Sequence, residues 1–506
     1  MVSIPHLFNT PFFPKILLLF ISFILLLFSY FAYPVVRGDS IFFIPAAINV
    51  AQGKGLINEL GYLSLILDKF HGQDFIYYPP LFPLILAKLS YQPTLQGIYF
   101  SSAIIAIFSL FLLYIIINIF RKKLAHAPDI KFKGILSIIL IGHSTGYITG
   151  NMRPELLSKF ILLTFIYLNI ILFKRKHFFI IVNAVLLGIT LLIHIYHALI
   201  FALLLALYYS IRFRCLEWLK YIFTTAFISI MLFILGVMAL SPFGLLRNLS
   251  GIYSHIKLIQ GINIHLEKIS PNLFLGFNLL DTGYFFYLPI ALLFLGIVIF
   301  STYTYWDVIR TKSIFLVILV LSIYLIYIVP TLREFPYYLY LMIPLIYIGI
   351  FVFIFYFKLS KFLFSITLFL LILPMGGFLR EVVLFPFFLT QGVSLEKART
   401  DYALLRSQNT ELIKNDEKIG ITISLWPLTY NFSELASDDM IKKTQLKIPY
   451  FLKQQIYSGN SILKESYNSC ILIHNNFVNE STRIFGIKLA NNIPGYSFAT
   501  YDCKKK

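Results

Sequence analysis

The sequence predicts an all-α polytopic membrane protein that carries a small α/β domain at its C-terminal end. Of the 506 residues, 58% are apolar and only 13% are charged, and the mean hydropathy is +0.81. A soluble globular protein needs far more charge on its surface, so this composition excludes one. Apolar stretches of about 18 residues or more recur along the first three quarters of the chain, and each can cross a bilayer as a helix. After Arg380 the composition becomes polar and mixed.

The positive charge of the chain is concentrated between its apolar stretches. The formal net charge is +19 at pH 7, which alone would suit a protein that binds nucleic acid. The basic residues instead cluster in every second loop, as they do in the cytoplasmic loops of membrane proteins. We therefore expect a topology signal and contact with anionic lipids, and no nucleic-acid partner. The clusters contain Arg121, Lys122 and Lys123; Lys131 and Lys133; Lys174, Arg175 and Lys176; Arg212, Arg214 and Lys220; Arg310 and Lys312; and Lys358 and Lys361.

The first predicted span covers residues 16–36, with the N-terminus in the cytoplasm. This stretch is too long for a signal peptide and has no small-x-small cleavage site, so we expect it to stay as the first membrane helix. An outer loop, 37–79, follows it.

Two short helices are predicted in and after this loop. Residues 40–51 alternate apolar and small residues at helical spacing and are followed by Gly53, which predicts a glycine-capped helix lying on the membrane surface. Pro79 and Pro80 then begin a short apolar helix, 80–90, because proline suits the first turn of a helix.

The remaining apolar stretches bring the expected number of spans to about eleven. An odd number places the C-terminus outside, and the outer loops so defined contain few lysines and arginines, as expected. Residues 1–380 are thus a transmembrane domain. The further spans are expected at 96–120, 134–149, 156–173, 178–193, 197–211, 219–241, 284–303, 314–330, 337–357 and 362–379.

Residues 381–506 are predicted to form the small extracytoplasmic α/β domain. Strand-like runs occur at 419–425, 470–474 and 496–503. Cys470 and Cys503 lie in this region, and either a disulfide between them or free thiols would fit an oxidising compartment.

Nearly all ionisable residues outside the basic clusters are assigned to the outer face. A transporter usually needs such groups near the middle of broken helices, whereas the spans here are almost free of charge. The pattern therefore favours an enzyme that acts at the membrane surface on a lipid-borne substrate. The residues on this face are Asp39, Asp68, Asp74, Arg153, Glu155, Arg247, Lys257, Asp281, Arg333 and Glu334.

A carboxylate at that surface suits the transfer of a sugar from a polyprenyl phosphate. An acceptor hydroxyl has a pKa far above 7, so it needs a general base as the new bond forms, and one positioned Asp can take that proton. Arginine and lysine can neutralise the phosphate that leaves. A single displacement needs no second carboxylate as nucleophile, and it inverts the configuration of the sugar.

Three short motifs carry a resemblance to a known superfamily. They are Arg37-Gly38-Asp39-Ser40, then Tyr78-Pro79-Pro80-Leu81, and Arg153-Pro154-Glu155 before the fourth span. In their order and placement, the chain resembles the GT-C glycosyltransferases over roughly residues 15–380. The branch it is most similar to contains the protein O-mannosyltransferases and the lipid A aminoarabinose transferases.

The resemblance implies a role for several residues. Asp39 would be the catalytic base, and Glu155 the second acidic residue, near the acceptor or a divalent metal; no cofactor is certain. Where such enzymes often have His or Lys before the Pro-Pro pair, this chain has Tyr78, which leaves Lys69 or His71 as the cation of that loop. Ser40 replaces the second acid common in protein mannosyltransferases, so a glycan or lipid acceptor is favoured over a protein. Arg333 lies in Leu332-Arg333-Glu334-Phe335-Pro336-Tyr337, which is similar to the Arg-Tyr-rich entry of the superfamily.

Ordinary structural interpretations exist for the same residues. Asp39 can cap the helix that follows it, and Arg153 and Glu155 can form a simple interfacial ion pair. His194 and His197 are spaced to bind a metal, but no third ligand is near them in the sequence, so satisfied interfacial histidines are the favoured interpretation.

Two other functions stay open from the sequence. A lipid-linked oligosaccharide ligase or polymerase would use arginines of the outer loop 242–282, with Arg247 as the candidate for binding the donor phosphate. A transporter or flippase would need ionisable groups inside the spans.

Overall fold

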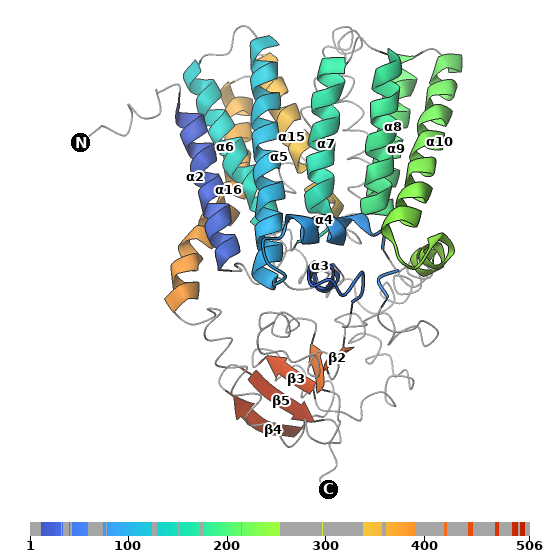
Figure 1. Ribbon diagram of the computed structural model, residues 1–506. Coiled ribbons are helices and arrows are strands. Elements are labelled where there is room, and N and C mark those ends of the chain that lie inside the picture. The colour runs from blue at the N-terminus through green and yellow to red at the C-terminus, as the bar shows by residue number, and fades with distance from the viewer. Residues whose placement is uncertain are drawn as a thin grey trace, which may run out of the picture.

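The computed structural model has a bundle of long helices and a separate five-stranded sheet (Figure 1). The structure describes residues 12–31, 33, 40, 43–58, 74–76, 78–123, 129–148, 152–172, 176–213, 215–253, 296, 337–356 and 361–390 and the five strands.

The long helices fall where the apolar stretches predict them. Five of them, α2, α5, α7, α10 and α16, contain stretches long and apolar enough to cross a membrane. The predicted spans 284–303 and 314–330 lie outside the described residues. The long helices are α2 (Phe13–Tyr30), α5 (Leu95–Lys123), α6 (Asp129–Ile148), α7 (Glu155–Leu172), α8 (Lys176–Ile193), α9 (Ile195–Arg212), α10 (Cys215–Leu240), α15 (Tyr337–Tyr356) and α16 (Lys361–Thr390).

Helix α2 shows how a helix of the bundle is built. Leu18, Ile21 and Leu25 recur at helical spacing and are buried against the bundle. Leu19 and Phe23 point the other way and are largely exposed. Large apolar side chains on the outer face suit a helix that meets lipid there, and are costly in water.

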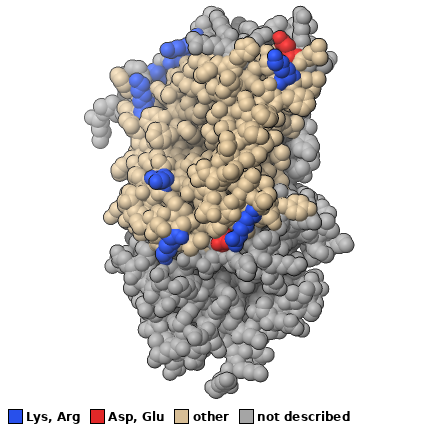
Figure 2. All heavy atoms as spheres, turned by 45° about the vertical axis from the view of Figure 1, so that its right-hand side comes forward, with Lys and Arg blue, Asp and Glu red and all other residues tan. Residues whose placement is uncertain are grey.

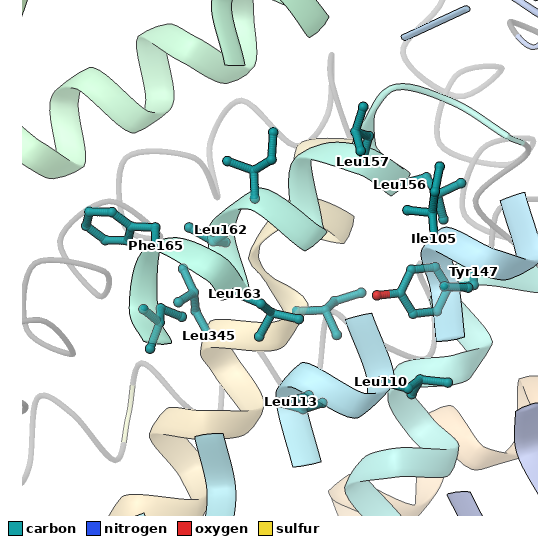
Figure 3. Packing of buried hydrophobic residues seen from close by; sticks show 14 of the residues in the cluster. Ile105, Leu110, Leu113, Tyr147, Leu156, Leu157, Leu162, Leu163, Phe165 and Leu345 are labelled. Atoms are coloured by element: carbon teal, nitrogen blue, oxygen red, sulfur yellow. The ribbon is translucent and has the colours of Figure 1, made fainter. Parts of the chain in front are cut away.

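Helix α7 lies inside the bundle, and this places its first residue at the centre of one end. Figure 3 shows the packing of its apolar side chains against α5, α6 and α15. Among the residues labelled there, Leu156, Leu157, Leu162, Leu163 and Phe165 belong to α7.

The helix predicted in the first outer loop is present, but it is buried in protein and does not present an exposed apolar face. Helix α3 spans Ile44–Ala51, and its residues 44–49 are all buried. It packs against α5 and the short helix α4 (Leu81–Leu89). The spacing of its apolar and small residues allows close packing inside protein as well as contact with lipid, so sequence alone did not separate the two.

The glycine cap of α3 is confirmed. Gly53 has a left-handed φ of 76°, and its N–H donates to the carbonyl of Val50 at 3.0 Å. The N–H of Lys54 donates to the carbonyl of Asn49 at 2.9 Å. These two bonds form a Schellman motif, which stops the helix and turns the chain. Pro80 is the N-cap residue of α4, in line with the predicted start at the Pro-Pro pair.

The C-terminal sheet has the strand order β2-β1-β3-β5-β4. Strand β1 is parallel to β2 and β3, whereas β5 is antiparallel to β3 and β4. Strands β1, β3 and β5 fall within the three strand-like runs; β2 and β4 were not predicted. That the region is a separate extracytoplasmic α/β domain stays a prediction, and Cys470 and Cys503 lie outside the described residues. The strands are β1 (Ile419–Thr422), β2 (Thr444–Ile448), β3 (Ile471–His474), β4 (Lys488–Ile493) and β5 (Tyr496–Thr500).

Candidate functional site

One end of the bundle collects the elements that carry the predicted site. Helices α3 and α4, the start of α7, the turn between α8 and α9 and the end of α10 lie at the same end (Figure 1). Arg121 and Lys122, at the C-terminal end of α5, lie at the other. On the face shown in Figure 2, the charged side chains of the described residues lie mostly near the two ends, and the band between them contains few charged residues. This arrangement agrees with the predicted division of loops; which end faces outward stays a prediction.

Glu155 lies at this end as the first residue of α7, and its carboxylate is buried. Its Oε2 is 3.2 Å from Nε of Arg153, and its Oε1 is 3.3 Å from Nη2 of the same arginine. Nε2 of His197 is 3.4 Å from Oε1. Both carboxylate oxygens therefore have a basic partner. The predicted Arg153–Glu155 pair is real, and its bidentate geometry is the strong form of such a pair.

The local backbone explains why Arg153 reaches Glu155. Met152 has a left-handed φ of 51°, which is uncommon for a residue with a side chain. The chain thus turns sharply before Pro154, and Arg153 folds back over the first turn of α7. A carboxylate in this turn is also favoured by the helix dipole, whose N-terminal end is positive.

His197 connects this pair to the interior of the bundle. Its Nδ1 is 2.7 Å from the hydroxyl oxygen of Ser158, which lies one turn along α7 from Glu155. The resulting order, serine–histidine–carboxylate, matches that of a nucleophilic triad. Ser158 and His197 are both fully buried, however, so a substrate does not reach the hydroxyl. The chain of contacts holds α9 against α7 and fixes the orientation of the Glu155 carboxylate.

Contacts between aromatic and histidine rings link the same cluster to the first outer loop. The ring of His194 lies 4.3 Å from that of His197 and 5.9 Å from that of Tyr78, with small angles between the planes. Tyr78 also packs on Phe43, which immediately precedes α3, at 4.7 Å. The predicted residue Tyr78 is thereby brought into one cluster with Arg153 and Glu155, although it lies far from both in the sequence.

A second polar group lies just inside this cluster. Lys159, one turn along α7 from Glu155, is buried, donates to the carbonyl of Gly146 at 3.2 Å and lies 5.2 Å from the ring centre of Tyr147. The hydroxyl of Tyr147 is 2.9 Å from Nε2 of His143. At a rise of about 1.5 Å per residue, Lys159 and His143 lie about 6–8 Å from the ends of their helices. They extend the site inward from one end, and do not form the midplane site that a transporter needs.

Arg247 occupies a different part of the same end. It forms an ion pair with Asp74, and its guanidinium lies 5.6 Å from the ring centre of Phe243. Asp74 in turn makes an isolated β-bridge with Ile57. Arg247, on which the ligase alternative depends, thus already has a carboxylate partner. The Arg247–Asp74 ion pair connects the chain after α10 to the end of the first outer loop.

The other predicted site residues are not placed by the structure. Asp39, Lys69, His71 and Arg333 lie outside the described residues. Within the described part of the chain, no group of three or more His, Cys, Asp or Glu side chains is arranged to hold a metal ion.

Three residues of the cluster were missed or undervalued in the sequence. His197 was interpreted as a satisfied interfacial histidine, but its partner is Glu155. Ser158 and Lys159 were not singled out, although Glu155, Ser158 and Lys159 share one face of a helix at spacings of three and four. The signal for Lys159 was present, since a lysine inside an apolar span is costly without a purpose.

Comparisons with known proteins give one similar structure. No protein-family model matches the chain, and no curated protein matches it in sequence. The crystal structure of an oligosaccharyltransferase of Archaeoglobus fulgidus, in complex with zinc and sulfate, is similar with a TM-score of 0.44 and 12% sequence identity. The similarity covers 92% of this chain and 69% of that chain. A likeness at this level assigns neither an activity nor a residue role to the present chain.

Proposed function

We propose that this protein is an integral-membrane inverting glycosyltransferase of the GT-C type. It would move a sugar from a polyprenyl-phosphate donor to a glycan, lipid or protein acceptor on the extracytoplasmic face. The observation that carries the proposal is the buried Arg153–Glu155–His197 cluster at one end of an apolar bundle, with Tyr78 of the Pro-Pro motif packed against it through His194.

The proposed reaction is a single displacement at the anomeric carbon of the donor sugar. The acceptor oxygen forms a bond to this carbon while the bond between the carbon and the phosphate oxygen breaks. The proton of the acceptor hydroxyl goes to the carboxylate of Asp39, and the electron pair of the broken bond leaves with the lipid phosphate.

Glu155 is proposed to orient the site and not to exchange protons with the substrate. Both its oxygens are already engaged, and it is buried. Arg153 is the more exposed member, with 14% of its side chain accessible against 5% for Glu155. It is therefore the member of the pair suited to meet the donor phosphate. Arg333, Lys69, His71 and Tyr78 are proposed as further contacts of the donor.

The test is chemical comparison of cell envelopes that contain or lack the protein. Mass spectrometry of glycans and lipid-linked sugars should show one sugar added to an acceptor only when the protein is present. The unused lipid-linked donor should accumulate when it is absent. Unchanged acceptors and donors under both conditions would contradict the proposal, and uptake of a solute without a covalent product would support a transporter instead.

A further inference from the structure

A short helix follows α10 and packs on the end of the first outer loop. It covers residues 245–253 and lies at the end of the bundle that holds α3 and α4 (Figure 1). Gly244, with a left-handed φ of 78°, turns the chain into this helix. Asn248 is fully buried, and its Nδ2 donates to the hydroxyl oxygen of Ser241, just after α10, at 2.6 Å. The 245–253 helix is therefore fixed to the end of α10.

Gly251 allows this helix to touch the backbone of the loop. A Cβ atom added there would lie 2.5 Å from the carbonyl oxygen of Ile76 and 2.8 Å from its Cγ1. The carbonyl oxygen would have to move to at least 3.4 Å to reach an ordinary contact with such an atom. Glycine is unfavourable inside a helix compared with alanine, so its presence at this position is explained by the close approach.

Two further contacts hold the same stretch of the loop. Asp74 forms its ion pair with Arg247, and the two side chains are 21% and 47% exposed. An exposed pair contributes little to stability, but it fixes which groups lie opposite each other. The N–H of Phe75 donates to the carbonyl of Leu56 at 3.1 Å. Residues 74–76 are thus held both by the helix and by the chain after α3.

The stretch held in this way packs directly on Tyr78. The rings of Phe75 and Tyr78 lie 6.3 Å apart, with an angle of 28° between their planes. The ring of Tyr78 also lies 4.7 Å from that of Phe43 and 5.9 Å from that of His194. Such pairs of rings prefer defined relative positions. A direct series of contacts therefore runs from the helix through Tyr78 to the Glu155 cluster.

We propose that Gly251 and the Asp74–Arg247 pair are positioning residues for Tyr78. This inference rests on the proposed function, in which Tyr78 contacts the lipid-linked donor. The helix limits where this stretch of the loop can lie, and Phe75 passes the restriction to the Tyr78 ring. A ring held in place before the donor arrives loses less freedom on binding, so the donor binds more tightly. Loss of the support should therefore raise KM for the donor and leave kcat little changed.

The experiment compares five variants with the wild type, all as purified full-length protein. Gly251→Ala places a methyl group against the loop. Asp74→Arg and Arg247→Asp each put like charges opposite each other, and the double variant restores an opposite pair in reversed order. Ser250→Ala is the matched control, because Ser250 is the exposed neighbour of Gly251 on the same helix.

Two properties are measured for each variant. The first is the rate at which tetranitromethane nitrates Tyr78, followed by peptide mass spectrometry, and it needs no enzymatic activity. Tyr91, which is 54% exposed, is the internal standard, and Tyr209, which is fully buried, reports unfolding if it reacts. The second property is the kinetics of sugar transfer, with kcat and KM for the lipid-linked donor determined separately.

We expect Asp74→Arg and Arg247→Asp to raise both the nitration rate of Tyr78 and KM by about 2- to 5-fold, in line with the usual strength of an exposed ion pair. Gly251→Ala should raise both by about 5-fold or more, because the added methyl group overpacks the contact. The double charge variant should return to within about 2-fold of the wild type, since the two residues act through one contact. Ser250→Ala should match the wild type.

Unchanged nitration of Tyr78 in Gly251→Ala and both charge variants, or faster nitration with unchanged KM, would overturn the inference. A double charge variant with KM as high as that of Arg247→Asp would also overturn it, because the guanidinium would then bind the donor directly. If Gly251→Ala unfolds, which nitration of Tyr209 would reveal, the charge variants still decide. If the wild type transfers no sugar, the proposed function fails, while the nitration rates still show whether the helix holds Tyr78.

Discussion

At the scale of single residues, the site depends on a buried carboxylate that is satisfied from two directions. Glu155 accepts from Arg153 at two oxygens and lies against His197. Removing one member of such a cluster leaves the others buried without a counter-charge, which costs far more than the intact cluster contributes. Glu155 is therefore expected to matter for folding as much as for activity.

Replacing Glu155 tests this dependence. We expect Glu155→Ala to lower the free energy of unfolding by about 3–5 kcal/mol, because the Arg153 guanidinium loses its buried partner. The double variant Arg153→Ala/Glu155→Ala should cost less than the sum of the two single variants, since no charge is then left unpaired. Thermal unfolding of the purified protein in detergent measures both. Additive effects would show that the two residues do not act as a pair.

At the scale of helices and strands, the sequence predicted most positions and few contacts. The spans were found because a run of apolar residues of sufficient length has no other stable place than a bilayer or a buried core. Helix α16 was expected to end at residue 379 where charges begin, yet it continues to Thr390. Arg380 and Glu381 satisfy each other, and Tyr33, just beyond the end of α2, supplies a further partner, so the charges do not end the helix.

The failures at this scale share a physical cause. The burial of α3 and the contact between His197 and Glu155 depend on which elements meet in three dimensions, and a local pattern holds no information about that. Strands β2 and β4 were missed because their sequences, such as Lys488–Ile493, contain polar residues where an alternating apolar face was sought.

The packing of α8 against α10 gives a prediction at the scale of elements. A Cβ atom added at Gly188 would lie 2.9 Å from Cβ of Leu232 and 3.2 Å from the carbonyl oxygen of Ser229. Small residues allow such close approach between membrane helices. Gly188→Ala should therefore push the helices apart and cost about 1–3 kcal/mol of stability.

Gly134→Ala in α6 is the matched control for this variant. Apart from the adjoining residues and backbone of α6 itself, no atom lies within 4 Å of a Cβ placed there. Because alanine favours a helix over glycine, this variant should be neutral or gain up to about 1 kcal/mol. The midpoints of thermal unfolding of both variants are compared with that of the wild type. Equal midpoints for the two variants would contradict the close packing of α8 and α10.

At the scale of the whole molecule, the polar chemistry of the described residues gathers at one end of an apolar bundle. The cluster around Glu155, the Asp74–Arg247 pair and the Tyr33–Glu381 contact all lie at the end that holds α3 and α4 (Figure 1). The predicted topology placed Asp74, Arg153, Glu155 and Arg247 on one face, whereas Tyr33 and Glu381 were not singled out in the sequence. The contacts of Glu155 with His197 and of Arg247 with Asp74 were not predictable, because these partners are far away in the sequence.

The orientation of the bundle can be tested by labelling single cysteines. Leu216 lies at the start of α10 and Leu246 lies shortly after its end, and their side chains are 84% and 83% exposed. In a background that lacks the three natural cysteines, a membrane-impermeant thiol reagent added to intact cells should label Leu246→Cys and not Leu216→Cys. The basic clusters place Leu216 in the cytoplasm. Labelling of Leu216→Cys alone would show that the topology is the inverse of the predicted one and that the site faces the cytoplasm.

The most direct test of the proposed chemistry is sugar transfer in membranes by wild-type protein and Asp39→Asn. The assay uses the lipid-linked donor that accumulates in cells lacking the protein, and the acceptor isolated from the same cells. Asp129→Asn, at the other end of the bundle (Figure 1), is the matched control. We expect Asp39→Asn to lower kcat by a factor of about 10²–10⁴, the usual contribution of a general base, while Asp129→Asn keeps full activity. Full activity of Asp39→Asn at normal expression would contradict the assignment of Asp39 as the base.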